Sequence, residues 1–235
     1  MGKPFTLGLC QTEVLGGDRA GNLQRARAAI DLAAGRGADI ALLPECVDLG
    51  WTDPSAATDA QPIPAGNSFQ ELAAAARENR IAVCAGLTER AGERVYNAAV
   101  YIGPDGECLA LHRKLNELSI GHSCYDQGDR LGTVDTPWGR IGVLICADAF
   151  AHRRVISQSL CYMGADVILS PCAWAVPADH DNTTDPYGDT WRDAYVPVCE
   201  NYQVWIAGVS NVGPIRGGPW AGRKCIGCSL LIGPG

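Results

Sequence analysis

The sequence lacks two features: an excess of positive charge, and an apolar run near the length that spans a bilayer. It carries 19 Lys and Arg against 26 Asp and Glu among 235 residues, giving a formal net charge of −7 at pH 7. Proteins that bind nucleic acid cluster Lys and Arg on one face, so this balance argues against such a partner. A transmembrane helix needs about 20 consecutive apolar residues. We therefore expect no nucleic-acid partner and no membrane partner.

The beginning of the chain also lacks the apolar core of a secretory signal peptide. Residues 1–6 instead alternate as a strand does, and they run directly into that strand, so we discount the loose myristoylation pattern of Gly2 and Thr6. The 11 cysteines are scattered and odd in number, and most lie in apolar runs, where a reduced thiol packs as a small hydrophobic group. Disulfide frameworks are typical of small secreted chains instead. Together these features predict a cytoplasmic protein.

No low-complexity linker or short-period repeat divides the chain, so we expect one domain over residues 1–235. Helix-like and strand-like segments alternate, and two pairs of strands are joined by hairpin turns at 103–106 and 137–139. Helical crossovers mixed with hairpins predict an α/β protein with mixed sheets covered by helices. The expected strands are 5–11, 39–44, 81–87, 95–102, 108–112, 131–135, 140–146, 166–170 and 203–210, the expected helices are 22–35, 68–79, 152–163 and 190–202, and a polar loop is expected over 175–189.

The last residues look like the first half of a hairpin. The segment 231–235 repeats the pattern of 101–106, which leads into a returning strand, but here the sequence stops at the turn. Either the protein ends in an unusual way or a C-terminal segment is missing, and both readings stay open.

Three strand-like runs end on residues that are capable of covalent chemistry. Glu45 follows the buried run 39–44, Lys114 follows the strand 108–112, and Cys146 closes the apolar run Ile141–Cys146. Each has an ordinary alternative, because Glu and Lys mostly lie on surfaces and Cys mostly lies in cores. Spacing alone does not bring them together. A thiol, a carboxylate and an ammonium that converge in one pocket would nevertheless suit covalent catalysis.

The contexts of these three residues resemble a known family. Leu43-Pro44-Glu45, Arg113-Lys114 and the segment 142–148 are similar, in this order, to the three signatures of the carbon–nitrogen hydrolase (nitrilase/amidase) superfamily. The resemblance extends to the N-terminal strand and to residues 164–171 and 204–211, and so covers nearly the whole chain. It implies a four-layer α-β-β-α sandwich, a homodimer or higher homo-oligomer paired through helical faces, and a Glu-Lys-Cys triad without metal or organic cofactor.

The resemblance also implies a role for each residue. Glu45 would act as general base, Lys114 would stabilise the oxyanion, and Cys146 would carry a thioester that water then hydrolyses. The backbone N–H of Ala147 is the expected second oxyanion donor, because the turn from strand to helix leaves N–H groups free there. Many family members have a second glutamate after the lysine, for which Glu117 is the candidate. A capping or surface role is the alternative for Glu117.

The residues after the nucleophile favour one reaction over another. Cys146-Ala147-Asp148 resembles the Cys-x-Asp of amide- and carbamoyl-cleaving members more than the Cys-Trp-Glu of nitrile-cleaving members. We therefore expect a small amide or N-carbamoyl substrate, with nitrile hydrolysis by the same triad as the alternative. Trp51 and Trp174 are predicted to line the substrate pocket, against the alternative of generic aromatic packing.

Two other functions do not require hydrolysis. The sequence Cys225-Ile226-Gly227-Cys228 is a lone CxxC that could bind zinc or undergo thiol redox chemistry, although its alternating apolar context favours packing. His180 stands between two aspartates without a matching ligand spacing, so we predict no metal site. An inactive relative that serves as an interaction module is the last alternative, and the intact triad argues against it.

Overall fold

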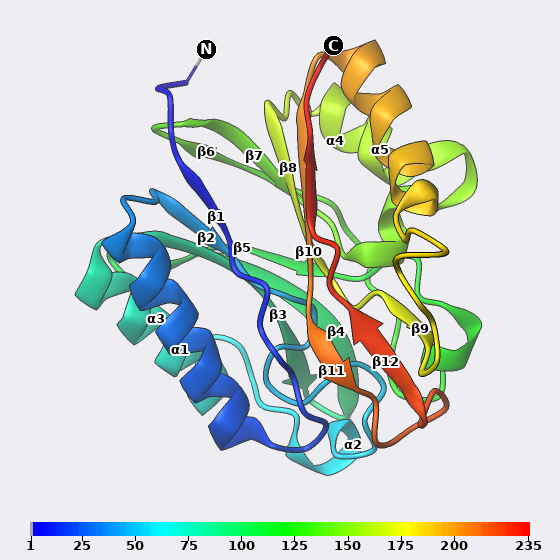
Figure 1. Ribbon diagram of the computed structural model, residues 1–235. Helices are drawn as coiled ribbons and strands as arrows, with labels where there is room; N and C mark the ends of the chain where they lie inside the picture. The colour runs from blue at the N-terminus through cyan, green and yellow to red at the C-terminus, as the bar shows by residue number, and fades with distance from the viewer. Residues whose placement is uncertain (1) are drawn as a thin grey trace.

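The computed structural model describes residues 2–235 as an α/β protein that contains two mixed sheets of five strands each (Figure 1). The strand orders are β1-β2-β3-β4-β5 and β13-β10-β8-β7-β6. The first sheet consists of β1 (Leu7–Leu9), β2 (Ile40–Leu42), β3 (Ala82–Ala91), β4 (Arg94–Ile102) and β5 (Cys108–Arg113). The second consists of β6 (Thr133–Thr136), β7 (Gly139–Val143), β8 (Val167–Cys172), β10 (Trp205–Ser210) and β13 (Leu230–Ile232).

Each sheet combines parallel and antiparallel pairs, as the alternation of crossovers and hairpins predicts. In the first sheet β1, β2 and β3 are parallel, and β4 and β5 are added by hairpins. In the second sheet β7, β8 and β10 are parallel, while β6 and β13 form antiparallel edges. The predicted α/β class with two mixed sheets is confirmed.

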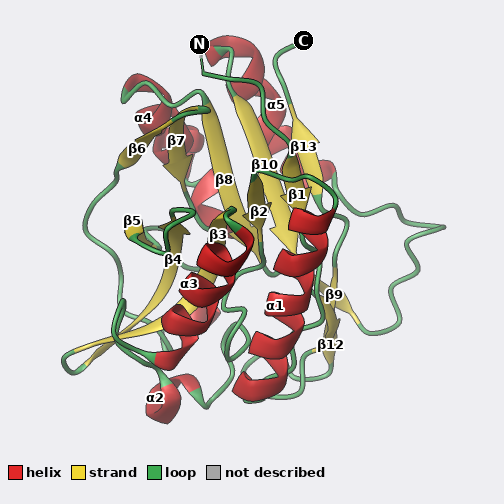
Figure 2. Cartoon of the chain, turned by 90° about the vertical axis from the view of Figure 1, so that its left-hand side faces the viewer, coloured by secondary structure: helices red, strands yellow, loops and turns green. Residues whose placement is uncertain are grey.

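Within residues 2–235, five α-helices complete the architecture: α1 (Arg19–Gly35), α2 (Ala56–Asp59), α3 (Asn67–Asn79), α4 (Val155–Tyr162) and α5 (Asp189–Tyr202). Figure 2 shows α1 and α3 side by side over one face of the first sheet, and Figure 1 shows α4 and α5 on the far side of the second sheet. In α1 the buried apolar residues Leu23, Ala26, Ile30 and Ala33 recur at helical spacing. One core therefore fills the space below α1 and α3, and another joins the two sheets and α5.

Several predicted boundaries are wrong; capping explains one of them and backbone conformation explains another. Helix α1 begins three residues earlier than predicted, because the side chain of Asp18 accepts a hydrogen bond from the N–H of Gly21 and caps the helix there. The predicted helix 152–163 is divided into a 3-10 turn, His152–Arg154, and α4. Arg153 and Arg154 both have positive φ (53° and 59°), which interrupts a regular helix.

A third, smaller sheet goes beyond the two that the sequence predicts. It is antiparallel, with the order β11-β12-β9, and consists of Val212–Pro214, Arg223–Ile226 and Ala175–Pro177. The strand β9 lies within the predicted polar loop 175–189, so only residues 178–188 of that loop lack a helix or strand. The apolar strand expected around the CxxC is β12, which contains Cys225 but ends before Cys228.

The edge strand β13 pairs antiparallel with β10, with Ile232 opposite Ile206. The expectation of a single domain, with or without a further C-terminal segment, stays a prediction. Among the helices formed by residues 2–235, none has both the length and the apolarity needed to cross a membrane.

Candidate active site

Glu45 is held where the two sheets meet. It follows β2 by three residues and is 1% exposed. Its backbone N–H donates to the carbonyl of Cys172, the last residue of β8 in the other sheet, at 3.1 Å. A side chain at Gly86 of β3 would come within 2.5 Å of the Cα of Glu45, so this close approach of the backbones requires a glycine. Contacts from both sheets therefore fix the position of the carboxylate.

Lys114 connects two carboxylates. It follows the last residue of β5, is 2% exposed, and donates from Nζ to Oε1 of Glu45 at 2.8 Å and to Oε1 of Glu117 at 2.9 Å. Nζ also lies 5.5 Å from the centre of the Trp51 ring, and Trp51 Nε1 donates to Glu117 Oε2 at 3.5 Å. The structure therefore brings four of the predicted site residues into one contiguous cluster.

Asn97 in β4 completes this cluster and is absent from the residues that the sequence singles out. Its Nδ2 donates to Glu45 Oε1 at 2.6 Å and to Glu117 Oε2 at 3.0 Å, and its carbonyl accepts from the backbone N–H of Lys114 at 2.8 Å. It is 1% exposed. A signal was present, because Asn is depleted from strands and this one interrupts an apolar run.

Cys146 lies at the start of a tight turn rather than at the end of a strand. The predicted strand 140–146 stops at Val143, and the 3-10 turn Cys146–Phe150 begins at the cysteine itself. Cys146 adopts φ = 45°, a left-handed conformation that few non-glycine residues tolerate, and such conformations cluster at functional sites. Its backbone N–H donates to Ser170 Oγ of β8 at 3.2 Å, and the residue is 7% exposed.

Ala147 follows within the same turn and is fully buried. Its carbonyl accepts a hydrogen bond of 2.7 Å from Nδ2 of Asn116, which lies two residues after Lys114. This contact connects the segment that carries the lysine to the turn that carries the cysteine.

Burial and mutual contact set the proton affinities of the site. Burial raises the pKa of the Glu45 carboxyl, and the nearby charge of Lys114 opposes that rise without cancelling it. Burial alone would lower the pKa of Lys114, but the carboxylates of Glu45 and Glu117 reverse the effect and hold it well above its usual value. Burial also raises the pKa of the Cys146 thiol well above its ordinary value. At neutral pH the thiol is therefore protonated and needs a base in order to react.

The two carboxylate oxygens of Glu45 have different surroundings. Both Asn97 and Lys114 donate to Oε1 of Glu45, whereas its Oε2 is buried and has no hydrogen-bond partner among residues 2–235. A buried carboxylate oxygen without a partner is costly, so such an atom calls for an explanation. An oxygen of this kind has a lone pair available to accept a proton.

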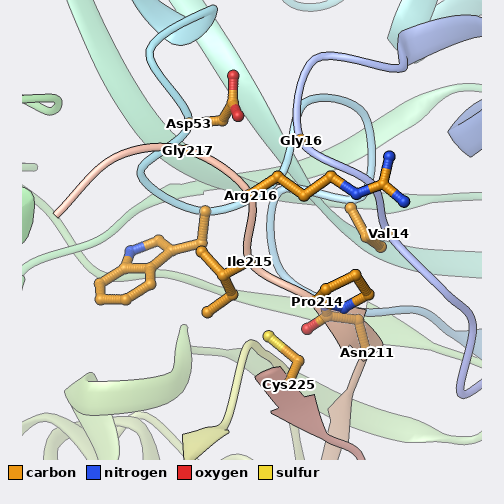
Figure 3. Close-up of a pocket in the computed structure, with 11 residues that line it drawn as sticks. Val14, Gly16, Asp53, Asn211, Pro214, Ile215, Arg216, Gly217 and Cys225 are labelled. Atoms are coloured by element: carbon orange, nitrogen blue, oxygen red, sulfur yellow. The ribbon is translucent and has the colours of Figure 1, made fainter. Parts of the chain in front are cut away.

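The two predicted pocket tryptophans occupy different surroundings. Trp51 contacts the charged cluster and also lines a pocket with Asp53, Arg216 and Cys225; Figure 3 shows Cys225 on the opposite side of this pocket from Asp53. Trp174 is 1% exposed and stacks on Trp191, with ring centres 4.6 Å apart, in the core that also contains Cys146. Substrate contact stays a prediction for both.

The residues of the alternative hypotheses have surroundings different from those of Glu45, Lys114 and Glu117. Each of the 11 cysteines, all within residues 2–235, is a free thiol. Cys225 packs in an apolar cluster with Trp51, and Cys228 is half-buried with Sγ 3.8 Å from Oδ1 of Asn182. His180 lies 3.6 Å from Asp185, and over the described range 2–235 no three His, Cys, Asp or Glu side chains are grouped as metal ligands.

Comparison with known families now adds to this geometry. Residues 6–195 match the carbon–nitrogen hydrolase family, a span that includes Glu45, Lys114 and Cys146. The chain belongs to the carbon–nitrogen hydrolase family. The predicted membership of the nitrilase/amidase superfamily is thereby confirmed.

Named members of the family are similar over much of their sequences. The chain is 32% identical over 251 residues to a chloroplastic omega-amidase of Arabidopsis thaliana, covering 98% of this chain and 62% of that protein. It is 31% identical to a nitrilase of Pyrococcus abyssi (91% and 75% covered) and 31% identical to an (R)-stereoselective amidase of Pseudomonas sp (84% and 67%). The chain thus spans less than two thirds of the Arabidopsis relative. These matches agree with its membership of the carbon–nitrogen hydrolase family.

Solved structures share the fold. A mutant of an amidase from Nesterenkonia sp. AN1, with acrylamide joined to its active-site cysteine by Michael addition, matches at a TM-score of 0.82 and 19% identity over 98% of this chain and 86% of that one. Nit3 of Saccharomyces cerevisiae matches at 0.79 and 22% identity over 97% and 82%. The arrangement of the two mixed sheets is therefore that of the nitrilase superfamily.

Proposed function

We propose that this protein hydrolyses the C–N bond of a small amide or N-carbamoyl compound through a thioester on Cys146. Glu45, Lys114 and Cys146 would form the triad, Glu117 would orient the lysine and the attacking water, and the N–H of Ala147 would be the second oxyanion donor. The observation that supports this most strongly is the state of the Glu45 carboxylate. Its Oε1 is bound by Lys114, while its buried Oε2 has no hydrogen-bond partner within residues 2–235 and can accept a proton.

The first half-reaction follows from these roles. Glu45 accepts the thiol proton as Sγ of Cys146 attacks the carbonyl carbon, and the C=O bond opens to an oxyanion that Nζ of Lys114 stabilises. Glu45 then gives the proton to the substrate nitrogen, the C–N bond breaks, and ammonia or an amine leaves. The product is an acyl thioester on Cys146.

In the second half-reaction a water molecule gives a proton to Glu45 while its oxygen attacks the thioester carbon. The C–S bond then breaks, the acid is released, and the proton returns to the sulfur of Cys146. The raised pKa of the Glu45 carboxyl suits these transfers, because its pKa comes closer to those of the groups with which it exchanges protons.

The choice of an amide or carbamoyl group over a nitrile rests on the Cys146-Ala147-Asp148 sequence and on the named relatives. Two of the three relatives described above are named amidases. Nitrile hydrolysis is the second candidate, because the Pyrococcus abyssi relative is named a nitrilase.

We also propose that the chain forms a four-layer α-β-β-α sandwich that pairs into a homodimer or higher oligomer. Exposed aromatic and apolar side chains support pairing near α4 and the second sheet: Tyr162 is 79% exposed, Trp205 47% and Leu231 43%. Sedimentation equilibrium tests this, and a monomer at all concentrations would contradict it. A cytoplasmic location stays a prediction.

The function is tested with Cys146→Ser and a panel of amides, carbamoyl compounds and nitriles. We expect wild-type protein to turn over an amide or carbamoyl compound and to show an acyl adduct on the Cys146 peptide by mass spectrometry. Cys146→Ser should lose both, while the matched control Cys161→Ser on α4 keeps both. Wild-type turnover by Cys146→Ser would refute the proposal. Bound zinc, or loss of function only on Cys228→Ser, would instead support the thiol or zinc hypothesis.

A further inference from the structure

We propose that Asp148 is the positioning residue that holds two parts of the site in place against each other. One is the lysine segment, residues 112–116, which carries Lys114; the other is the nucleophile turn, Cys146–Phe150, which begins at Cys146. This inference rests on the proposed function, because it concerns how the same site is assembled. Asp148 is two residues after Cys146, and its carboxylate is fully buried.

The carboxylate of Asp148 accepts four hydrogen bonds from two segments of the chain. Its Oδ1 accepts from the backbone N–H groups of Leu115 (3.0 Å) and Asn116 (2.7 Å), the two residues directly after Lys114. Its Oδ2 accepts from the backbone N–H of Ile145 (2.9 Å) and is 2.8 Å from Nε2 of His112 in β5. One side chain therefore connects residues on both sides of Lys114 to the residue just before Cys146.

The geometry requires a carboxylate and not an isosteric amide. Four donors point at the two oxygens of Asp148, and an amide has only one acceptor oxygen. In an Asp148→Asn variant the NH2 group would face at least one backbone N–H group. The lysine segment or the nucleophile turn would then have to move.

The electrostatic surroundings are consistent with a permanent negative charge. Burial alone would raise the pKa of Asp148, but the contact with His112 and the charge of Lys114 outweigh it and leave the pKa below its usual value. Buried charges are stabilising only when they are paired and fully hydrogen-bonded, which is the case here. The four hydrogen bonds of Asp148 therefore hold the two segments in a fixed relative position.

A second hydrogen bond also connects the lysine segment to the nucleophile turn. Asn116 Nδ2 donates to the carbonyl of Ala147 at 2.7 Å, so the lysine segment also holds the peptide next to the nucleophile. The oxyanion donors must be placed to within a fraction of an ångström, and a displacement of about 1 Å can cost about 100-fold in rate. A residue that fixes the lysine relative to the cysteine would thus act on the transition state and not on substrate binding.

The experiment compares Asp148→Asn with Glu89→Gln, a matched buried carboxylate that accepts from Arg113 of β5 at 2.7 Å and does not touch the site. For Asp148→Asn we expect kcat to fall about 100-fold, with KM changed by less than about threefold. Glu89→Gln should keep the wild-type kcat, even if the melting temperature falls by a similar amount in both variants.

A second readout does not depend on turnover. The folded protein is treated with iodoacetamide at a series of pH values, and mass spectrometry measures how fast the peptide that contains Cys146 is alkylated. The pH dependence of this rate reports the ionisation of the thiol. The charge of Lys114 lowers the pKa of Cys146, so a displaced lysine in Asp148→Asn should move the alkylation midpoint to higher pH. A general loss of stability, as in Glu89→Gln, should leave the midpoint unchanged.

If Asp148→Asn does not fold, Asn116→Ala decides the question. It removes the side-chain bond to the Ala147 carbonyl, which also connects the lysine segment to the nucleophile turn, and should lower kcat about tenfold with KM unchanged. The inference would be overturned by a wild-type kcat in Asn116→Ala, or by an Asp148→Asn variant that behaves as Glu89→Gln does. The proposed function would survive either result. Wild-type activity in Cys146→Ser would instead overturn the proposed function.

Discussion

The two sheets contribute different halves of the candidate site. The first sheet supplies the charged half, with Glu45 after β2, Asn97 in β4 and Lys114 after β5, and side-chain hydrogen bonds hold it together. The second sheet supplies Cys146 after β7, and the charges that act on its thiol are those of Glu45 and Lys114 in the first half. Backbone conformation holds this second half, through the positive φ of Cys146 and the bond of its N–H to Ser170.

This difference follows from what each half has to do. The charged half moves protons and stabilises an oxyanion, so its groups need one another to remain ionised when buried. The thiol half has to present one sulfur atom and the neighbouring N–H group, and a tight turn held by hydrogen bonds to Ser170 and Asp148 does that. The two halves should therefore fail in different ways when they are mutated.

Glu45→Gln should have the largest effect on turnover. The amide keeps an oxygen for Lys114, so the geometry of the charged half survives, but it cannot accept a proton. We expect kcat to fall about 1,000-fold, within the range for loss of a general base. Steady-state kinetics measures this, with Glu89→Gln as the control carboxylate. A fall of less than tenfold would mean that Glu45 is not the base.

Lys114→Met should damage both function and stability. It leaves the buried carboxylates of Glu45 and Glu117 without their shared cation, which costs about 3–5 kcal/mol for a broken buried pair. Loss of an oxyanion donor should also lower kcat about 100- to 1,000-fold.

Urea unfolding and kinetics test this prediction, with Arg140→Met as the control, because Arg140 pairs with Asp135 and both side chains are exposed. An equal loss of stability in the two variants would contradict the buried-pair argument.

Asn97→Ala should have an intermediate effect, because it removes two bonds to carboxylates but no charge. A hydrogen bond to a charged group contributes about 1.5–3 kcal/mol, so kcat should fall by about 10- to 100-fold. The control is Asn22→Ala, which removes a buried asparagine of α1 that donates to Leu15 and Asp48 carbonyls. It should lower the melting temperature but not kcat. If the two variants had the same kcat, Asn97 would be only structural.

The pH dependence of activity and of stability distinguishes the two halves without any mutation. Glu45 has a raised pKa, so kcat/KM should fall as pH drops through a midpoint above the usual Glu value of about 4.3. Asp148 has a lowered pKa, so its stabilisation is complete above the usual Asp value of about 3.9 and is lost only below it. Activity should therefore disappear before the fold does. Loss of circular dichroism at the same pH as loss of kcat/KM would contradict this order.

Local patterns in the sequence predicted the three signature residues but not their supports. Glu45, Lys114 and Cys146 each end or follow a recognisable strand, and Glu117 was proposed because many members of the resembled family carry a second glutamate after the lysine. Asn97 was missed because it lies inside a strand, where polar residues are normally read as exposed. Its role depends on β4 lying next to β5 and on contact with a residue 52 positions away.

The strand that leads to Cys146 shows the same limit on a smaller scale. The apolar run Ile141–Cys146 is continuous in sequence, and nothing in its composition marks Val143 as the last ladder residue. The end of β7 is set by its neighbour β8, because Ser170 accepts from the N–H of Cys146 and draws it into the turn. A boundary set by a contact across the sheet cannot be read from one strand.

The sequence by itself determined the alternation of helices and strands, the two hairpins, and the three motifs that identify the family, because these depend on residues that are neighbours in the chain. The tertiary structure decided which groups meet. Glu45 and Lys114 are 69 positions apart, yet Nζ and Oε1 are separated by 2.8 Å. Only the order of strands in two sheets, and the burial that makes each charge dependent on its partner, brings such residues together.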